Sequence, residues 1–132
     1  MIFVDTSYWA ALRNERDGRH GDAVALIRQV GSSPLLTTNH VRGETWTLLR
    51  RRAGHRSAIA FLDALERSPR LTMVNLDPAM EARALRWLRR HDERPYSFVD
   101  ATSFIAMKVE RIKEALAFDG DFSAAGYVEL RP

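Results

Sequence analysis

Short apolar runs alternate with longer amphipathic stretches along the chain, and this alternation restricts the possible folds more than any other feature. Runs at 2–5, 35–37, 71–76 and 115–118 have the length and composition of buried strands, and a fifth lies at 127–130. Stretches with helical spacing separate them. Strands that alternate with helices form a parallel sheet whose faces the helices cover. The sequence therefore predicts an α/β fold with a parallel sheet of four to five strands.

Turn and capping residues predict where the helices begin and end. Asp77-Pro78 is a helix start, with Asp as N-cap and Pro at the first helical position. Ser97 begins a strongly apolar helix, and glycines at 31 and 54 end two others. The 132 residues suit one core, so we expect a single domain over 1–132. The expected helices span 7–13, 22–30, 39–53, 56–66, 77–91 and 97–110.

The composition excludes several classes of protein. Without cysteine, the chain has no disulfides, no thiolate catalysis and no cysteine-rich zinc site. No apolar run approaches the length of a membrane span, and the N-terminus lacks the basic region of a signal peptide. We therefore expect a cytoplasmic protein without membrane contact. The histidines lie too far apart in sequence to form a ligand-spaced pair: His20, His40, His55 and His91.

The charge balance is mildly basic and strongly biased to arginine. The net charge is +3, and eighteen arginines stand against two lysines. Arginine pairs with phosphate bidentately and stacks on bases, so the bias suits nucleic acid; a GC-rich genome produces the same bias. The arginines at 50–52 and at 83, 86 and 90 contact RNA backbone or form solvated helix faces, and both interpretations stay open.

Four acids occupy positions that suggest one site. Asp5 ends the first expected strand and Asp119 the fourth, and ligands of open α/β sheets bind at the carboxyl ends of the strands. Glu44 lies at the edge of the apolar stripe of its helix, and Asp100 lies in a helix that is apolar nearly all round. These four side chains are expected to converge on one cleft.

Each acid also has a purely structural interpretation. Asp5 can cap the following helix, and Ser97 with Asp100 three residues later is a capping-box pattern. Glu44 can be a solvated flank residue, and Asp119 with the next glycine is ordinary turn chemistry. Asp77 serves as a comparison, because capping explains it fully.

Four carboxylates in one cleft are not stable together without a proton or a cation. Two carboxylates about 5 Å apart repel by roughly 3 kcal/mol at an effective dielectric of about 20. Anionic ligand sets made only of oxygen select hard divalent ions such as Mg²⁺ or Mn²⁺. Such clusters hydrolyse phosphodiesters.

The ordered set Asp5, Glu44, Asp100 and Asp119 resembles the PIN domain, and specifically the VapC toxins of type II toxin–antitoxin systems. The opening IFVDTSYW, the later SFVDA and the closing AFDGDF carry the resemblance, which covers essentially the whole chain. It implies a three-layer α/β/α sandwich around the sheet. It also implies a Mg²⁺- or Mn²⁺-dependent endoribonuclease that a VapB-type antitoxin inhibits, usually as a homodimer.

Carried over residue by residue, the resemblance implies that the four main acids hold metal or position its water. Asp121 is expected to serve a second metal or to support the first. Thr6 is expected to offer its hydroxyl to the acids or the substrate, and Ser97 supports the cluster or acts only as a cap.

Other assignments fit less well. A haloacid-dehalogenase-like phosphatase needs a second Asp where this chain has Ser7, and a Toprim-like nuclease needs Glu where it has Asp5. A response regulator needs a late lysine in the sheet, and Lys108 and Lys113 both lie in or at the end of a helix in the expected structure. The alternative from another class is a PIN domain without catalysis that binds RNA or protein.

Overall fold

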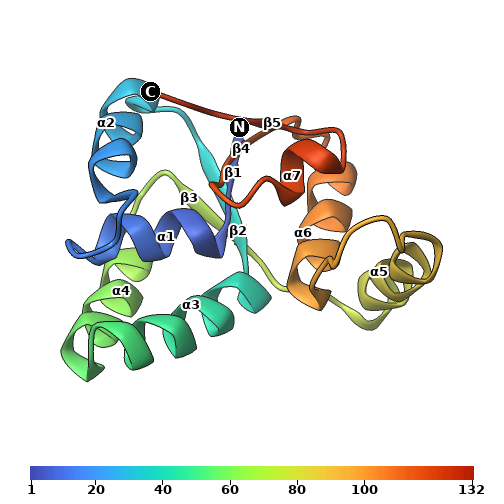
Figure 1. Ribbon diagram of the computed structural model, residues 1–132, viewed down its shortest axis with the longest axis horizontal. Coiled ribbons are helices and arrows are strands. Elements are labelled where there is room, and N and C mark those ends of the chain that lie inside the picture. The colour runs from blue at the N-terminus through green and yellow to red at the C-terminus, as the bar shows by residue number, and fades with distance from the viewer.

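Five parallel strands form one sheet at the centre of the computed structural model, which describes all residues from 1 to 132 (Figure 1). The order across the sheet is β3-β2-β1-β4-β5, and every neighbouring pair is parallel. The strands are β1 (Ile2–Val4), β2 (Leu35–Thr38), β3 (Leu71–Val74), β4 (Glu114–Leu116) and β5 (Val128–Glu129). The predicted parallel α/β sheet is confirmed, including its fifth strand.

The connections between strands divide the helices between the two faces of the sheet. The first two connections run from β1 to β2 and from β2 to β3, in one direction across the sheet, and the later two run in the opposite direction. Since parallel crossovers are right-handed, opposite directions place the helices on opposite faces. One face carries α1 (Thr6–Arg13), α2 (His20–Val30), α3 (Asn39–Arg52) and α4 (His55–Arg67); the other carries α5 (Pro78–Arg90), α6 (Phe98–Val109) and α7 (Asp121–Ala124) (Figure 1). The predicted three-layer sandwich is therefore confirmed.

The local signals placed most helix ends within a few residues. Asp77 caps α5, because its Oδ1 accepts a hydrogen bond from the Met80 backbone N–H at 2.8 Å. Several features differ from the predictions. The short helix α7 was not expected. β3 and β4 each end two residues earlier than expected, at Val74 and Leu116, and β5 has two residues instead of four. Beyond the end of β4, the backbone N–H of Phe118 donates to the Ser7 hydroxyl at 3.0 Å.

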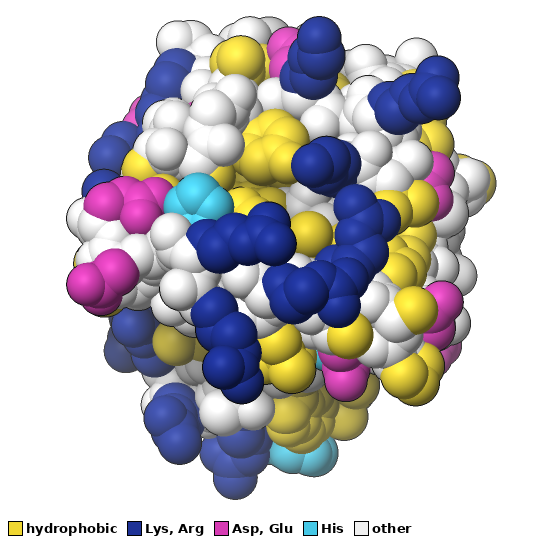
Figure 2. All heavy atoms as spheres, turned by 90° about the vertical axis from the view of Figure 1, so that its right-hand side faces the viewer, with side chains coloured by type: hydrophobic (Ala, Val, Ile, Leu, Met, Phe, Trp, Pro, Cys, Tyr) yellow, Lys and Arg dark blue, Asp and Glu magenta, His cyan; other side chains and the backbone are white.

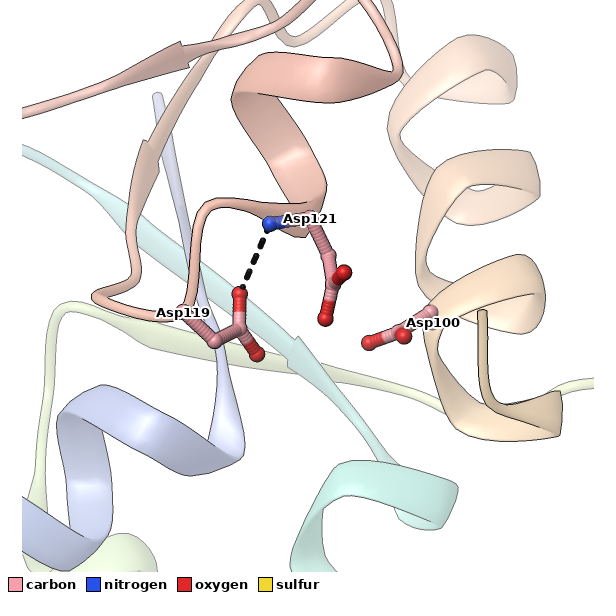
Figure 3. A group of neighbouring side chains, drawn as sticks. All are labelled: Asp100, Asp119 and Asp121. Carbon is pink, nitrogen blue, oxygen red and sulfur yellow. Dashed lines mark hydrogen bonds between the residues drawn. The ribbon is translucent and has the colours of Figure 1, made fainter. Parts of the chain in front are cut away.

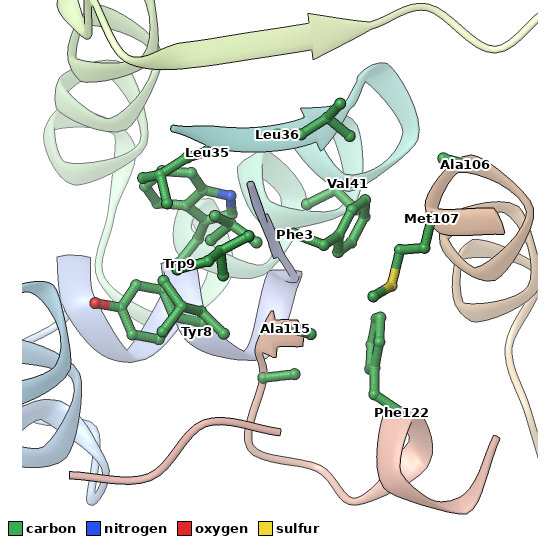
Figure 4. Packing of buried hydrophobic residues seen from close by; sticks show 14 of the residues in the cluster. Phe3, Tyr8, Trp9, Leu35, Leu36, Val41, Ala106, Met107, Ala115 and Phe122 are labelled. Carbon is green, nitrogen blue, oxygen red and sulfur yellow. The ribbon is translucent and has the colours of Figure 1, made fainter. Parts of the chain in front are cut away.

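The core is continuous through the sheet. Phe3 and Val4 in the central strand are fully buried, and so are Met107 of α6 and Phe122 of α7 on the second face (Figure 4). Burying side chains of this size is the main favourable term in folding. None of the helices combines the length and the apolar character needed to cross a membrane.

The topology creates one crevice. The chain leaves β1 toward β2 and leaves its neighbour β4 toward β5. Where adjacent strands lead in opposite directions, the following loops separate, and ligands bind at the carboxyl ends of those strands. A ligand-binding site is therefore expected among the residues that follow β1 and β4.

Candidate active site

Asp5 follows β1 directly and begins α1. Its carboxylate caps the helix: Oδ2 accepts hydrogen bonds from the Ser7 backbone N–H at 3.1 Å and from the Ser7 hydroxyl at 2.7 Å. Because the same hydroxyl accepts from Phe118, Ser7 joins the ends of β1 and β4. Asp5 is only 2% exposed. The strand and the cap together hold this carboxyl at the crevice.

Asp100 reaches the crevice from the first turn of α6. Its Oδ2 accepts from the Ser97 backbone N–H at 2.9 Å, and its own backbone N–H donates to the Ser97 hydroxyl at 2.9 Å. This is a complete capping box. The rest of the helix packs into the core, so Asp100 is buried, at 7% exposure.

Asp119 lies in the turn between β4 and α7, and Asp121 is the first residue of α7. The Asp119 Oδ1 accepts a hydrogen bond from the Asp121 backbone N–H at 3.1 Å. Gly120 between them has φ +82°, a left-handed conformation that favours glycine. The buried carboxylate of Glu129 accepts hydrogen bonds from the backbone of Gly120 and Ser123, at 3.2 and 2.8 Å. Glu129 thus fixes the turn that carries both aspartates.

Three of these carboxylates form a compact group. Asp100, Asp119 and Asp121 each offer an oxygen, and the three oxygens lie within 4.8 Å of one another (Figure 3). In Figure 3 the carboxylates of Asp100 and Asp121 point toward each other across the gap between α6 and α7. A group of oxygen ligands at this separation suits a hard cation.

Burial and the neighbouring charges both make these carboxyl groups harder to ionise. Burial, followed by the charge of Asp119, raises the pKa of Asp5 to about 7. Burial and the charges of Asp121 and Asp119 likewise raise the pKa of Asp100 to about 7. Asp119 is exposed at the mouth of the crevice, yet partial desolvation of its carboxyl, with the nearby charges of Asp121 and Glu129, raises its pKa to about 6. An added cation would relieve this repulsion.

The hydrogen bonds divide each carboxylate into a held oxygen and a free one. In Asp5 and Asp100 the held oxygen is Oδ2, which accepts the capping bonds. In Asp119 and Asp121 it is Oδ1, bonded to a backbone N–H and to Arg94 respectively. The second oxygen of each accepts no hydrogen bond from the protein. The four side chains are therefore oriented while four oxygens stay available to a ligand.

Glu44 and Thr6 line a cleft that adjoins this group. The cleft has a volume of about 350 Å³, and Asp5 and Asp119 form part of its wall. Glu44 is exposed on α3 and lies outside the compact group of three. The Thr6 hydroxyl is buried and has no hydrogen-bond partner within the protein. The expected convergence on one cleft therefore holds for Asp5, Glu44 and Asp119, while Asp100 and Asp121 meet Asp119 at its edge.

Sequence reasoning missed three residues that organise the site: Ser7, Glu129 and Arg94. A serine two residues after a helix-capping aspartate is a weak local signal for the first. Glu129 is an acid within a two-residue strand, and nothing in the sequence marks it as buried. The Arg94 side chain bonds Asp121 through Nε and the Asp119 carbonyl through Nη2 at 3.0 Å, and no local pattern predicts this contact.

Comparison with known proteins agrees with this fold. A family model described as PIN domain matches residues 2–126. The 23S rRNA-specific endonuclease VapC20 of Mycobacterium tuberculosis is 56% identical over 134 aligned positions, which cover 100% of this chain and 99% of that protein. A VapC ribonuclease of Archaeoglobus fulgidus is 28% identical, covering 91% of this chain and 78% of the relative. The crystal structure of the M. tuberculosis VapC20, described as a sarcin–ricin loop cleaving toxin, superposes over the whole of both chains with a TM-score of 0.94 at 54% identity.

Proposed function

This chain belongs to the PIN-domain family and is an endoribonuclease of the VapC toxin type, and we propose that its acid cluster uses a divalent metal ion to cut 23S ribosomal RNA. One observation carries the proposal: Asp5, Asp100, Asp119 and Asp121 meet at the crevice between β1 and β4 with one oxygen of each free. The full-length identity of 56% to a 23S rRNA-specific endonuclease supports the choice of RNA.

The residues present suit Mg²⁺ or Mn²⁺. All candidate ligands are oxygens. Burial, followed by the charges of neighbouring aspartates, raises the pKa values of Asp5 and Asp100, and a cation would favour their charged forms. The compact group Asp100, Asp119 and Asp121 would hold the ion, with Asp5 beside it. Such an ion would supply positive charge to polarise the phosphate and to favour ionisation of water.

The chain itself supplies orientation and proton acceptance. Ser7 and the capping box of Ser97 keep the Asp5 and Asp100 side chains in place, so they need not reorganise when RNA arrives. Glu44, which lines the same cleft as Asp5 and Asp119, would orient the attacking water and accept its proton. The unpartnered Thr6 hydroxyl can donate to a phosphate oxygen.

Basic side chains around the cleft suit an RNA strand. Arg19 and Arg52 line the cleft beside Asp5. Figure 2 shows more Lys and Arg than Asp and Glu side chains on the side of the molecule that carries α5 and α6, two helices that contribute no residue to the lining of this cleft. Contacts of this kind hold the phosphate backbone and contribute affinity without sequence preference. A loop such as the sarcin–ricin loop that the M. tuberculosis toxin cleaves would suit this cleft, because proteins recognise RNA mainly at loops and splayed bases and not in regular duplexes.

The toxin role requires a partner. We propose a homodimer that a VapB-type antitoxin inhibits, in the cytoplasm where ribosomes lie. A suitable inhibitor would present an arginine to the acid cluster, because its fork pairs with carboxylates and keeps its charge. The alternative, a PIN domain that only binds RNA or protein, does not explain why several carboxylates meet at one crevice.

Cleavage by the purified protein tests the proposal. The chain should cut a 23S RNA fragment that contains the sarcin–ricin loop in the presence of Mg²⁺ or Mn²⁺, and should spare the same fragment with that loop scrambled. Asp100→Asn should abolish cleavage. Asp77→Asn, which changes an exposed capping acid outside the cluster, should leave cleavage unchanged. Binding of the fragment without any cleavage would favour the non-catalytic alternative.

A further inference from the structure

We propose that Arg94 both positions Asp121 and binds a phosphate of the RNA, acting as a cation built into the acid cluster. The inference rests on the proposed function. Arg94 lies in the segment 91–97 between α5 and α6, and its guanidinium reaches across to the turn before α7. It makes an ion pair with Asp121 and a hydrogen bond to the Asp119 carbonyl.

Arg94 differs from the hydrogen-bond donors that hold the other three aspartates, because it is positively charged. Neutral backbone N–H or hydroxyl groups hold Asp5, Asp100 and Asp119. Only Asp121 is held by a charged group. A neutral donor would be enough to orient a carboxylate, so the positive charge has a further consequence: it offsets part of the negative charge of the cluster before any ion binds.

Arg94 also has N–H groups that donate to no acceptor in the protein. A guanidinium has five N–H groups in a planar fork, and Arg94 uses one at Nε and one at Nη2. The remaining donors face no acceptor of the protein, and 38% of the side chain is exposed. A phosphate bound at the acid cluster would lie beside these donors, and a guanidinium fork matches phosphate geometry.

The turn is shaped to admit the guanidinium. A Cβ atom placed on Gly120 would lie 3.1 Å from Arg94 Nη2, closer than nine in ten real Cβ contacts, so the guanidinium would have to shift. Glycine at this position therefore both adopts the left-handed backbone and leaves room for the fork against the Asp119 carbonyl. Arg94 thus contacts the same segment, 119–121, that contains the two aspartates.

The proposal predicts opposite effects on metal and RNA. Arg94→Gln removes a positive charge beside the cluster and keeps an amide N–H donor for Asp121, so Mn²⁺ should bind as tightly as to the wild type or tighter, by up to about 10-fold. The same variant should lose about 100-fold in kcat/KM for RNA. Its RNA affinity in EDTA should depend less on salt, with a slope smaller by about 0.7. Arg67→Gln, which removes an exposed charge at the end of α4, is the matched control and should change none of these.

Mn²⁺ binding by calorimetry, RNA binding in EDTA and single-turnover cleavage are measured on wild type, Arg94→Gln and Arg94→Lys. The lysine variant keeps the charge without the fork, so it should keep the wild-type salt slope and cleave at an intermediate rate. Weaker binding of both Mn²⁺ and RNA by Arg94→Gln would reveal a merely structural role and overturn the proposal, as would unchanged cleavage. If Arg94→Gln does not fold, a lysine variant with a reduced salt slope overturns it. A wild type that does not cleave would instead refute the proposed function, and the Mn²⁺ comparison would still test the place of Arg94 beside the ion.

Discussion

Replacing Asp5 by Asn should make the metal-free protein more stable at mildly alkaline pH. Asp5 is almost fully buried, and its pKa is raised from 3.8 to about 7. The folded state therefore holds this proton more tightly than the unfolded state does. The resulting penalty is absent below the unfolded pKa, grows as pH rises from about 4 to about 7, and is complete above that. Asn removes the charge and remains one of the best N-cap residues.

The size of the effect follows from the shift. About 3 pKa units at about 1.4 kcal/mol each set an upper limit of roughly 4 kcal/mol at about pH 8. Asn loses the charge-assisted part of the two bonds from Ser7, so a net gain of about 1–3 kcal/mol is expected. At about pH 5 the folded carboxyl is already protonated, and most of the gain should disappear.

Urea denaturation in EDTA measures this directly, at about pH 5 and about pH 8. Asp77→Asn is the control, because Asp77 caps α5 in the same way but is exposed and belongs to no acid group. Saturating Mg²⁺ should reverse the order of stability at the higher pH, since the ion stabilises the wild type more than the variant. An Asp5→Asn variant that is destabilised at the higher pH, or equally stabilised at both, would refute the reasoning.

Three further results are expected. EDTA should stop RNA cleavage, and Mn²⁺ or Mg²⁺ should restore it and raise the melting temperature; cleavage that persists in EDTA would remove the metal from the mechanism. Expression of the chain alone should arrest growth, and Asp100→Asn or the co-expressed neighbouring antitoxin should each relieve the arrest. Relief by the antitoxin alone would indicate a toxic binder. Ser7→Ala should cost about 1–3 kcal/mol of stability and reduce cleavage, because the link between Asp5 and Phe118 is lost; full activity would show that Asp5 needs no such support.

The sequence predicted the residues whose signals are local. The end of an apolar strand marked Asp5, and the apolar surroundings in its helix marked Asp100 as a buried acid; both positions are confirmed. Parallel topology then accounts for the meeting of Asp5 and Asp119, since their strands are neighbours in the sheet. These inferences needed only periodicity, capping and the rule for strand ends.

The residues that the sequence did not reveal depend on distant pairings. Ser7 meets Phe118 across 111 positions, and Arg94 meets Asp121 across 27. Neither pairing follows a helical or strand period, so no local pattern encodes it. Glu129 is nearer, nine positions from Gly120, but its burial depends on how the last strand closes the sheet. Such contacts follow from the assembled fold and cannot be read in advance from one sequence.

The structural and catalytic interpretations of the acids do not compete. Asp5 is the N-cap of α1 and Asp100 completes the capping box of α6, and the capping bonds that explain them locally also hold one oxygen of each and leave the other free. Asp77 makes the same kind of cap on an exposed helix end and joins no group. What separates it from the other two is burial beside further carboxylates. A cap is therefore no evidence against a metal ligand. The hydrogen bonds that stabilise the helix ends also hold the carboxylates close together, where they repel one another. A cation that binds among them removes this repulsion, and the free energy released contributes to its affinity.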